Sequence, residues 1–391
     1  MKFGVYIHIP HCLQQCSYCD FATLPISHKT SPADYASILI QEIEKRNPAV
    51  PYRSVSTIYF GGGTPSLMEP EDLGRILDGL RSSSFDLSNL EEMTLEINPG
   101  TIHQEKLLDL LRLGFTRFSV GAQTFSSSHL ASLGREHSVD QTRETLALLQ
   151  RHRVSFTADL LFGLPDQDLK HLQKDIESLL VFEPKHLSAY CLTLPEKHPL
   201  NRGRPEDDVQ AEMFYFVERE LEKVGLHRYE VSNFAVPGHE SKHNQLYWQD
   251  APYWGLGLGA HSYFHDSQLG VRFWNPNHIE AYRKQVAEIQ PLVSAGLPAS
   301  LPQNQAEFLT TSQSLTDFIH TQLRRSRGLS IEAVEKKYGL FTRTQVEERL
   351  ERLLARSLVR WQSPFWTIDQ RALVLSEQVF QEMTFLATDL L

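Results

Sequence analysis

Short apolar runs alternate with longer amphipathic segments through the first part of the chain. The runs are rich in β-branched and aromatic side chains and cover residues 5–9, 55–60, 93–97, 117–120, 156–162 and 187–194. Each is followed by a turn and then by apolar residues at helical spacing, which is typical of strands that alternate with helices. We therefore expect an α/β fold with a parallel sheet, and about six such units predict a partial (β/α)6 barrel rather than a closed eight-unit barrel.

Local signals mark the ends of two crossover helices. Ser31 followed by Pro32 predicts a helix start, and Thr101 with Gln104 predicts a capping box. Gly114 predicts the end of the second helix, because glycine readily takes the left-handed conformation that closes a helix.

After residue 235 the alternation ends. An aromatic and glycine-rich segment at 243–273, followed by a helix near 278–289, predicts an antiparallel extension of the sheet. A stretch rich in Pro, Ala, Ser and Gln at 294–305 predicts a linker.

The C-terminal part has the element order of a small winged-helix-like α+β domain. Its helices are expected at 309–325, 331–337 and 344–355, and its strand pair near 358–368. The predicted division of the chain is a partial barrel at 1–235, the extension with its linker at 236–300, and the C-terminal domain at 301–391.

Composition and charge exclude several classes of protein. Of the 391 residues, 41% are hydrophobic and 22% charged, so the chain can bury a core and is not predominantly disordered. The formal charge of -10 is opposite in sign to that of a dedicated nucleic-acid binder. No stretch approaches the roughly 18 apolar residues of a membrane span, and no cleavable signal precedes the first run. We expect a cytoplasmic protein that does not bind nucleic acid; peripheral association with a membrane stays open.

Three of the four cysteines lie in one loop. Cys12, Cys16 and Cys19 have the spacing C-x-x-x-C-x-x-C directly after the first run, whereas Cys191 stands alone. This is not the distribution of a disulfide framework. A structural zinc site is one alternative, but it normally takes four protein ligands. Three thiolates with one vacancy better suit an iron-sulfur cluster whose fourth iron stays open.

Polar residues and glycines gather where the predicted strands end. Gly61, Gly62, Gly63 and Thr64 close the second strand, and without a following Lys-Ser/Thr they do not form a P-loop. Later strand ends or the loops after them carry Glu96, Gln123, Asp159 and Arg135. Ordinary hydrogen bonding at the end of a barrel is the alternative for any one of these residues, but it explains the whole set poorly.

The tri-cysteine loop after the first strand resembles that of the radical S-adenosylmethionine (SAM) superfamily. The resemblance implies that Cys12, Cys16 and Cys19 bind a 4Fe-4S cluster and that its open iron is chelated by SAM. In that superfamily an electron from the cluster can cleave the sulfonium to a deoxyadenosyl radical. Tyr18 matches an aromatic position that covers the cluster or lies near adenine.

Further motifs are similar to those of the oxygen-independent coproporphyrinogen III oxidase family and its relatives, over nearly the whole chain. The motifs are Tyr6-Ile7-His8-Ile9-Pro10, the glycine loop, and Gly163-Leu164-Pro165 after Asp159. The resemblance implies SAM contacts from Tyr6, Gly62, Gly63, Thr64, Glu96, Gln123, Arg135 and Asp159.

Two departures favour a sister group, the HemW-type heme chaperones, over the oxidases themselves. Phe21 stands where oxidases carry a further cysteine, and only five residues precede Tyr6. The run His243-Asn244-Gln245-Leu246-Tyr247-Trp248 matches the H-N-x-x-Y-W motif of those chaperones, which is associated with heme. Imidazole is a standard heme ligand, so this resemblance implies heme contacts from His243, Tyr247 and Trp248. His8, His11 and His261 stay open as alternative ligands.

The sequence therefore predicts a heme chaperone on a radical SAM scaffold, with a 4Fe-4S cluster, SAM and heme as its cofactors. Its expected partners are heme-acceptor proteins and an electron donor such as flavodoxin or ferredoxin. The alternative is an oxygen-independent coproporphyrinogen III oxidase. RNA modification is a third hypothesis, resting on basic pairs such as Arg324-Arg325 and Lys336-Lys337, but interleaved acidic residues favour a solvated helix face there.

Overall fold

A single twelve-stranded sheet forms the frame of the molecule in a computed structural model that describes residues 2–265, 269–289, 305–386 and 389. Six neighbouring strands run parallel, each paired with the next in chain order. They are β1 (Gly4–Ile9), β4 (Thr57–Gly62), β5 (Glu92–Ile97), β6 (Arg117–Gln123), β7 (Ser155–Phe162) and β8 (His186–Cys191). The six predicted strands and the partial barrel are confirmed, because no pairing closes the sheet within the described residues.

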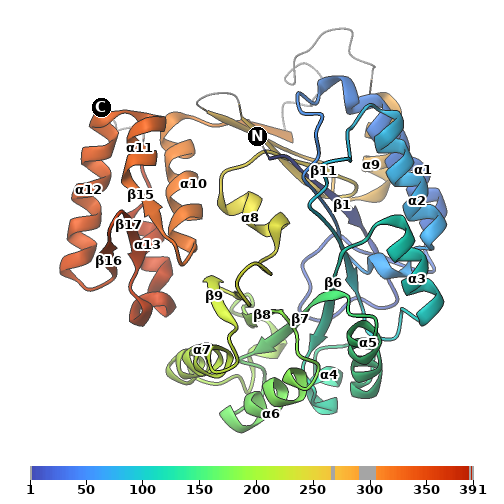
Figure 1. Cartoon of the computed structure of the whole chain (residues 1–391), viewed down its shortest axis with the longest axis horizontal. Helices are drawn as coiled ribbons and strands as arrows, with labels where there is room; N and C mark the ends of the chain where they lie inside the picture. The colour runs from blue at the N-terminus through green and yellow to red at the C-terminus, as the bar shows by residue number, and fades with distance from the viewer. Residues whose placement is uncertain (1, 266–268, 290–304, 387–388, 390–391) are drawn as a thin grey trace.

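Helices cover the outer face of the parallel strands (Figure 1). They are α1 (Pro32–Arg46), α2 (Pro70–Ser82), α3 (Gln104–Leu113), α4 (Ser127–Ser132), α5 (Val139–Arg151), α6 (Leu169–Leu180) and α7 (Asp207–Glu222). Their apolar stripes pack on strand residues such as Ile58, Leu95 and Phe118, which are fully buried. Short 3-10 turns lie at η1 (Asn47–Ala49), η2 (Pro65–Leu67), η3 (Pro199–Asn201) and η6 (Gln370–Leu375).

The predicted helix boundaries are partly right. Ser31 caps α1 in a capping box, and Gly114 ends α3 with φ at 99°. The predicted box at Thr101 is wrong: His103 caps α3, and the Thr101 hydroxyl donates to the carbonyl oxygen of Asn98 at 2.6 Å. The hydroxyl is thus used in the turn before the helix.

Antiparallel strands extend the sheet at both edges. Beyond β1 lie β11 (Tyr253–Leu256), which is parallel to β1, and then β12 (His261–His265), β13 (Gly270–Trp274) and β14 (Ala306–Phe308). The predicted extension is confirmed. At the other edge, β10 (Asn233–Ala235) and β9 (His227–Glu230) form a hairpin that we did not predict. Two helices belong to this part, α8 (Lys242–Trp248) and α9 (Ile279–Glu288).

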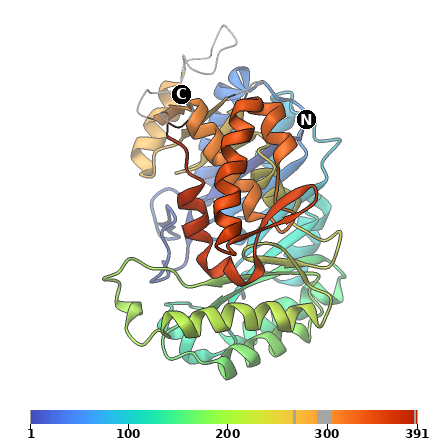
Figure 2. The ribbon, with the colours of Figure 1, turned by 90° about the vertical axis from the view of Figure 1, so that its left-hand side faces the viewer.

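The C-terminal segment forms the predicted winged-helix-like unit (Figures 1 and 2). It has its own hydrophobic core. In the described part of this segment, a three-stranded sheet of order β15-β17-β16 packs with four helices. The elements are α10 (Thr311–Arg324), β15 (Leu329–Ser330), α11 (Ile331–Tyr338), α12 (Leu340–Ala355), β16 (Val359–Gln362), β17 (Phe365–Ile368) and α13 (Ser376–Glu382). The domain limits at 235 and 300 stay predictions, and all but Gln305 of the predicted linker lies outside the described residues.

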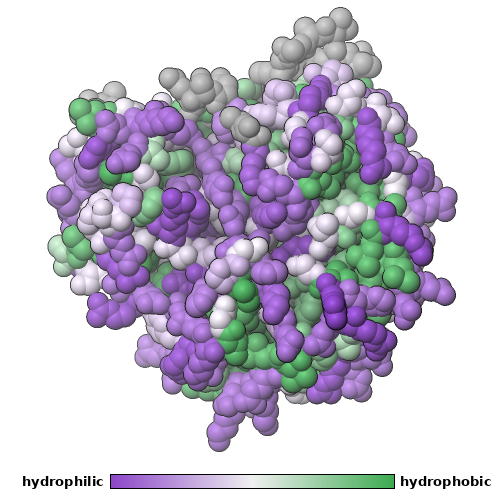
Figure 3. All heavy atoms as spheres, viewed as in Figure 1, coloured by the Kyte–Doolittle hydropathy of each residue, from purple (hydrophilic) through white to green (hydrophobic). Residues whose placement is uncertain are grey.

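Ion pairs join this unit to the rest of the chain. Arg324 on α10 lies 2.6 Å from Glu230, and Lys337 on α11 pairs with Asp250. Two of the basic residues considered for RNA binding are therefore paired within the chain. The face in Figure 3 is mostly hydrophilic, with apolar side chains in smaller patches. Across the described ranges, no helix combines the length and apolar character that a membrane crossing requires.

Candidate functional site

The cysteine loop follows β1 and is closed at its base. β2 (His11–Cys12) pairs with β3 (Leu24–Pro25) in a small parallel sheet. Between them the amide of Cys19 donates to the carbonyl of Cys16 at 3.2 Å. The loop is therefore held as a turn that faces the carboxyl ends of the barrel strands, where ligands gather in such folds.

The three cysteines line a cavity of about 450 Å³, which we call the cysteine cavity. Eight of the nine residues predicted to contact SAM line it as well, although they come from separate strands and loops. They are Tyr18, Gly62, Gly63, Thr64, Glu96, Gln123, Arg135 and Asp159. The ninth, Tyr6, lies outside this cavity; its hydroxyl is 3.1 Å from Nδ1 of His8.

The cysteine thiols give the cavity a set of soft metal ligands. Burial raises the pKa of Cys12 to about 11 and also raises the pKa of Cys19, so a metal is needed to hold them as thiolates. Among the described residues, no three His, Cys, Asp or Glu side chains are grouped as a site for one metal ion. Thiolates are the usual ligands of iron-sulfur clusters, so three thiols around one cavity suit such a cluster. Arg135 adds a hydrogen-bond donor to one of these sulfurs, because its Nη1 lies 3.5 Å from Sγ of Cys16.

The glycine loop at the end of β4 packs directly on the end of β1, where the cysteine loop begins. Gly62 has φ at +113°, and a Cβ there would lie 2.4 Å from the ring of His8. A Cβ on Gly63 would lie 2.6 Å from the carbonyl oxygen of Pro10. Only glycine fits at these two positions, because a side chain would collide with the ring of His8 at Gly62 and with the backbone of Pro10 at Gly63.

Two buried carboxyl groups face the cavity. Glu96 accepts from the hydroxyl of Tyr59 at 2.8 Å and from the amide of Gly62 at 3.0 Å. Burial raises its pKa from 4.5 to about 7. Asp159 accepts from the hydroxyl of Ser119 at 3.2 Å, and burial raises its pKa too. A cationic ligand would favour the ionised form of both groups.

Arg135 and Gln123 complete the wall at the end of β6. Arg135 donates to the side-chain oxygen of Asn98 at 2.6 Å and to the carbonyl of Gly121 at 2.8 Å. Its Nε is buried without a hydrogen-bond partner in the described part of the chain. Gln123 has φ at 62°, an uncommon backbone conformation that is found at functional sites.

A second cavity of about 850 Å³ lies next to the first, and we call it the aromatic cavity. It is bordered by β1, α8, the strands β11 to β13 and helix α10. Four residues line both cavities: Phe21, Gly62, Glu96 and Tyr190. Its aromatic lining comprises Tyr6, Phe21, Tyr59, Tyr190, Tyr247, Trp248, Tyr253 and Tyr263.

The residues of the predicted heme motif lie on α8, and all three line the aromatic cavity. His243 is 1% exposed; its Nδ1 is 2.8 Å from the hydroxyl of Thr57 and its Nε2 is 2.7 Å from the hydroxyl of Tyr247. Both ring nitrogens are therefore engaged. The guanidinium carbon of Arg324 lies over Trp248, 4.6 Å from the centroid of the indole ring. Ligation by His243 stays a prediction.

Of the three histidines that stay open as alternative heme ligands, two line the aromatic cavity and one does not. His11 is buried, bonds the carbonyl of Thr30 at 2.9 Å and does not line either cavity. His8 and His261 line the aromatic cavity, and so does His320, which the sequence did not single out.

Several residues of the two cavities were missed in the sequence. They are Tyr59, Asn98, Ser119 and Tyr190. Asn98 and Tyr190 carry a signal that could have found them, because both lie near the ends of parallel strands. Tyr59 and Ser119 carry none, since their roles depend on reaching Glu96 and Asp159 across neighbouring strands.

Comparison with known proteins agrees with this geometry. The family model "Radical SAM superfamily" matches residues 6–179. The heme chaperone HemW of Bacillus subtilis is 33% identical over 348 residues, which cover 86% of this chain and 87% of the relative. HemW of Lactococcus lactis is 32% identical and covers 91% and 90%. The solved structure of coproporphyrinogen III oxidase (HemN) from Escherichia coli matches with a TM-score of 0.82 at 22% identity over 98% of this chain and 90% of that one, which shows a shared fold. The chain thus belongs to the radical SAM superfamily and, within it, to the family of the heme chaperone HemW.

Proposed function

We propose that this chain is a heme chaperone that binds heme in the aromatic cavity and passes it to acceptor proteins. The observation that carries the proposal is the wall of Phe21, Gly62, Glu96 and Tyr190 that both cavities share. A ligand in the cysteine cavity touches groups that also face the aromatic cavity. Binding in the cysteine cavity can therefore influence how the aromatic cavity binds heme.

The cysteine cavity is the proposed site of a 4Fe-4S cluster and SAM. Cys12, Cys16 and Cys19 would each hold one iron and leave the fourth for SAM. Glu96 and Asp159 supply negative charge for the ammonium and sulfonium groups, and Arg135 supplies a cation for the carboxylate. When bound, the cluster and SAM supply one-electron chemistry.

The aromatic cavity has the size and lining for a porphyrin. Its volume of about 850 Å³ lies within the range of about 300–1,000 Å³ that is usual for small-molecule sites. The side chains of Tyr247, Tyr253 and Tyr263 offer flat apolar surface with a polar end, which suits a planar ring that carries propionates.

An electron donor such as flavodoxin or ferredoxin is the proposed partner at the cysteine loop. Leu13 and Phe21 are 46% and 62% exposed there, which gives a donor an apolar surface beside the cluster. The proposed setting is the cytoplasm, where thiols stay reduced.

Heme titration and transfer test the proposal. Anaerobically reconstituted protein is titrated with heme, followed by its Soret band, and is then mixed with apomyoglobin as a probe acceptor. We expect one heme per chain and transfer to the acceptor. Absence of saturable heme binding would overturn the proposal.

The alternative function is tested on the same preparation. Coproporphyrinogen III and SAM are added with a reductant, and porphyrin products are analysed by chromatography. We expect no decarboxylated product. Formation of protoporphyrinogen would assign the chain to the oxidases instead, whose solved member has this fold.

A further inference from the structure

We infer that His261, rather than the motif residue His243, is the axial ligand of the heme iron. This inference rests on the proposed function and names the residue that fixes the cargo. Among the described residues, four histidines line the aromatic cavity: His8, His243, His261 and His320.

An axial ligand must offer a free nitrogen lone pair. His8 is 4% exposed, with Nε2 2.8 Å from the carbonyl of Ala22 and Nδ1 3.1 Å from the hydroxyl of Tyr6. His243 is bound through both nitrogens to Thr57 and Tyr247. Either ring would have to break a buried hydrogen bond and move before it could reach a metal, which is costly.

His261 meets the requirement without rearrangement. It begins β12 and is exposed, and its ring makes no hydrogen bond to any described residue. Trp274, its neighbour across the β12–β13 ladder, stacks on it with ring centroids 5.8 Å apart and an interplanar angle of 24°. This stacking fixes the plane of the imidazole while both nitrogens stay free. Although the residue is exposed, partial desolvation of the ring and the nearby Arg272 both lower the pKa of His261, which favours the neutral ring at pH 7.

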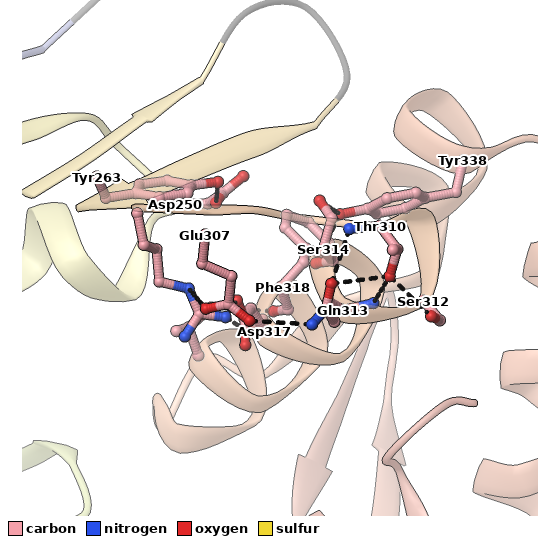
Figure 4. Close-up of polar contacts among 12 residues, drawn as sticks. Asp250, Tyr263, Glu307, Thr310, Ser312, Gln313, Ser314, Asp317, Phe318 and Tyr338 are labelled. Atoms are coloured by element: carbon pink, nitrogen blue, oxygen red, sulfur yellow. Dashed lines mark hydrogen bonds and ion pairs between the residues drawn. The ribbon is translucent and has the colours of Figure 1, made fainter. Parts of the chain in front are cut away.

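The strand that carries His261 also supplies the surroundings of a porphyrin. Tyr263 lies two residues further along β12, on the same face, and its hydroxyl donates to Asp250 at 2.7 Å. Arg272 is opposite Tyr263 on β13 and also lines the cavity. Its guanidinium pairs with Asp317 and lies 3.8 Å from Glu307, two carboxylates that lie close together in Figure 4. Heme propionates are carboxylates of the same kind, so they can replace these partners at Arg272.

His320 is the weaker candidate on α10. Its Nε2 is 3.4 Å from the hydroxyl of Thr384, and its ring lies 5.2 Å from that of Phe380. It is therefore held toward the C-terminal unit, away from the sheet face of His261.

The test compares ligand spectra of matched histidine variants. Wild type, His261→Ala, His261→Cys, His320→Ala and His227→Ala are titrated with heme and examined by absorption and electron paramagnetic resonance. His227 is exposed on β9 outside the cavity, so it controls for the loss of any surface imidazole. Since His261 makes no hydrogen bond to the residues that the structure describes, its variants are expected to fold, which near-UV circular dichroism checks.

We expect His261→Ala to lose the imidazole signature and to bind heme about tenfold more weakly, with added imidazole restoring the spectrum. His261→Cys should show a thiolate-ligated spectrum, which a merely structural residue would not produce. An unchanged spectrum in His261→Ala, or its loss in His320→Ala alone, would overturn the inference. If wild-type protein binds no heme, the proposed function fails instead.

Discussion

The imidazole Nε2 of His243 lies 2.7 Å from the hydroxyl oxygen of Tyr247, one turn further along α8. The other ring nitrogen reaches Thr57 on β4, and the backbone amide of His243 donates to Glu92 at 3.0 Å. Two residues of the predicted heme motif thus bind each other and tie α8 to the barrel. The motif positions the wall of the aromatic cavity.

Replacing His243 by Ala should destabilise the protein, because it leaves Thr57 and Tyr247 without a partner at a buried site. We expect the free energy of unfolding to fall by about 2–4 kcal/mol. Urea denaturation of the cluster-free protein measures the loss. Asn244→Ala, at the next position of α8, is the control and should cost clearly less. Equal stability of the two variants would contradict a structural role for His243.

Gly63→Ala should disturb the cysteine loop, since the new Cβ would lie 2.6 Å from the backbone oxygen of Pro10. We expect iron loading after reconstitution to fall severalfold. Gly74→Ala is the control: it lies within α2, where the nearest contact is the flexible side chain of Leu113 at 3.2 Å. Full iron loading of Gly63→Ala would show that the two loops move independently.

Glu96 should make stability depend on pH. Its pKa is raised from 4.5 to about 7 by burial. Between these values the folded chain keeps a proton on Glu96 that the unfolded chain has released, so the free energy of unfolding falls as the pH rises. Glu96→Gln removes this contribution, which amounts to about 3 kcal/mol at most. Denaturation of the cluster-free protein at pH 4.5 and pH 8 measures it. Glu105→Gln, an exposed change on α3, is the control and should keep the wild-type dependence of unfolding free energy on pH. If Glu96→Gln kept that dependence too, the carboxyl of Glu96 would be ionised throughout this pH range.

Lys337 should hold the C-terminal unit against the sheet extension. Its ammonium pairs with Asp250 and lies 5.1 Å from the ring centroid of Phe318. Lys337→Met should therefore cost about 1–3 kcal/mol and speed hydrogen exchange in α10 and α11. Lys336→Met changes the exposed neighbouring residue and should do neither. Identical exchange in both variants would place the attachment elsewhere, for instance at Arg324 and Glu230.

The periodic part of the fold was predictable, whereas its edges were not. The strand at 156–162 is mostly apolar, and burial on both faces of a parallel sheet favours that pattern. The hairpin of β9 and β10 is short and mixed in character, so its pairing depends on tertiary contacts. The capping box at Thr101 failed because α3 begins at Gln104 after the cap His103, so Thr101 lies in the preceding turn, where its hydroxyl donates to the carbonyl of Asn98.

The cysteine cavity could be predicted because it is built at strand ends. Glu96, Gln123 and Asp159 come from neighbouring parallel strands, so topology alone brings them together. The order of the parallel strands does not predict the aromatic cavity. Arg272 and Asp317 meet there across 45 positions in the chain, between a sheet edge and a separate core, and no local pattern encodes that contact.

The proposed function depends on an iron-sulfur cluster that Cys12, Cys16 and Cys19 bind with one iron free for SAM. The most direct measurement is metal and sulfide analysis of anaerobically prepared protein, combined with electron paramagnetic resonance of the reduced form before and after addition of SAM. We expect about four iron and four sulfide per chain, a signal that SAM alters, and retention of both in Cys191→Ala but not in Cys16→Ala. One zinc per chain without sulfide, or a cluster signal indifferent to SAM, would contradict it.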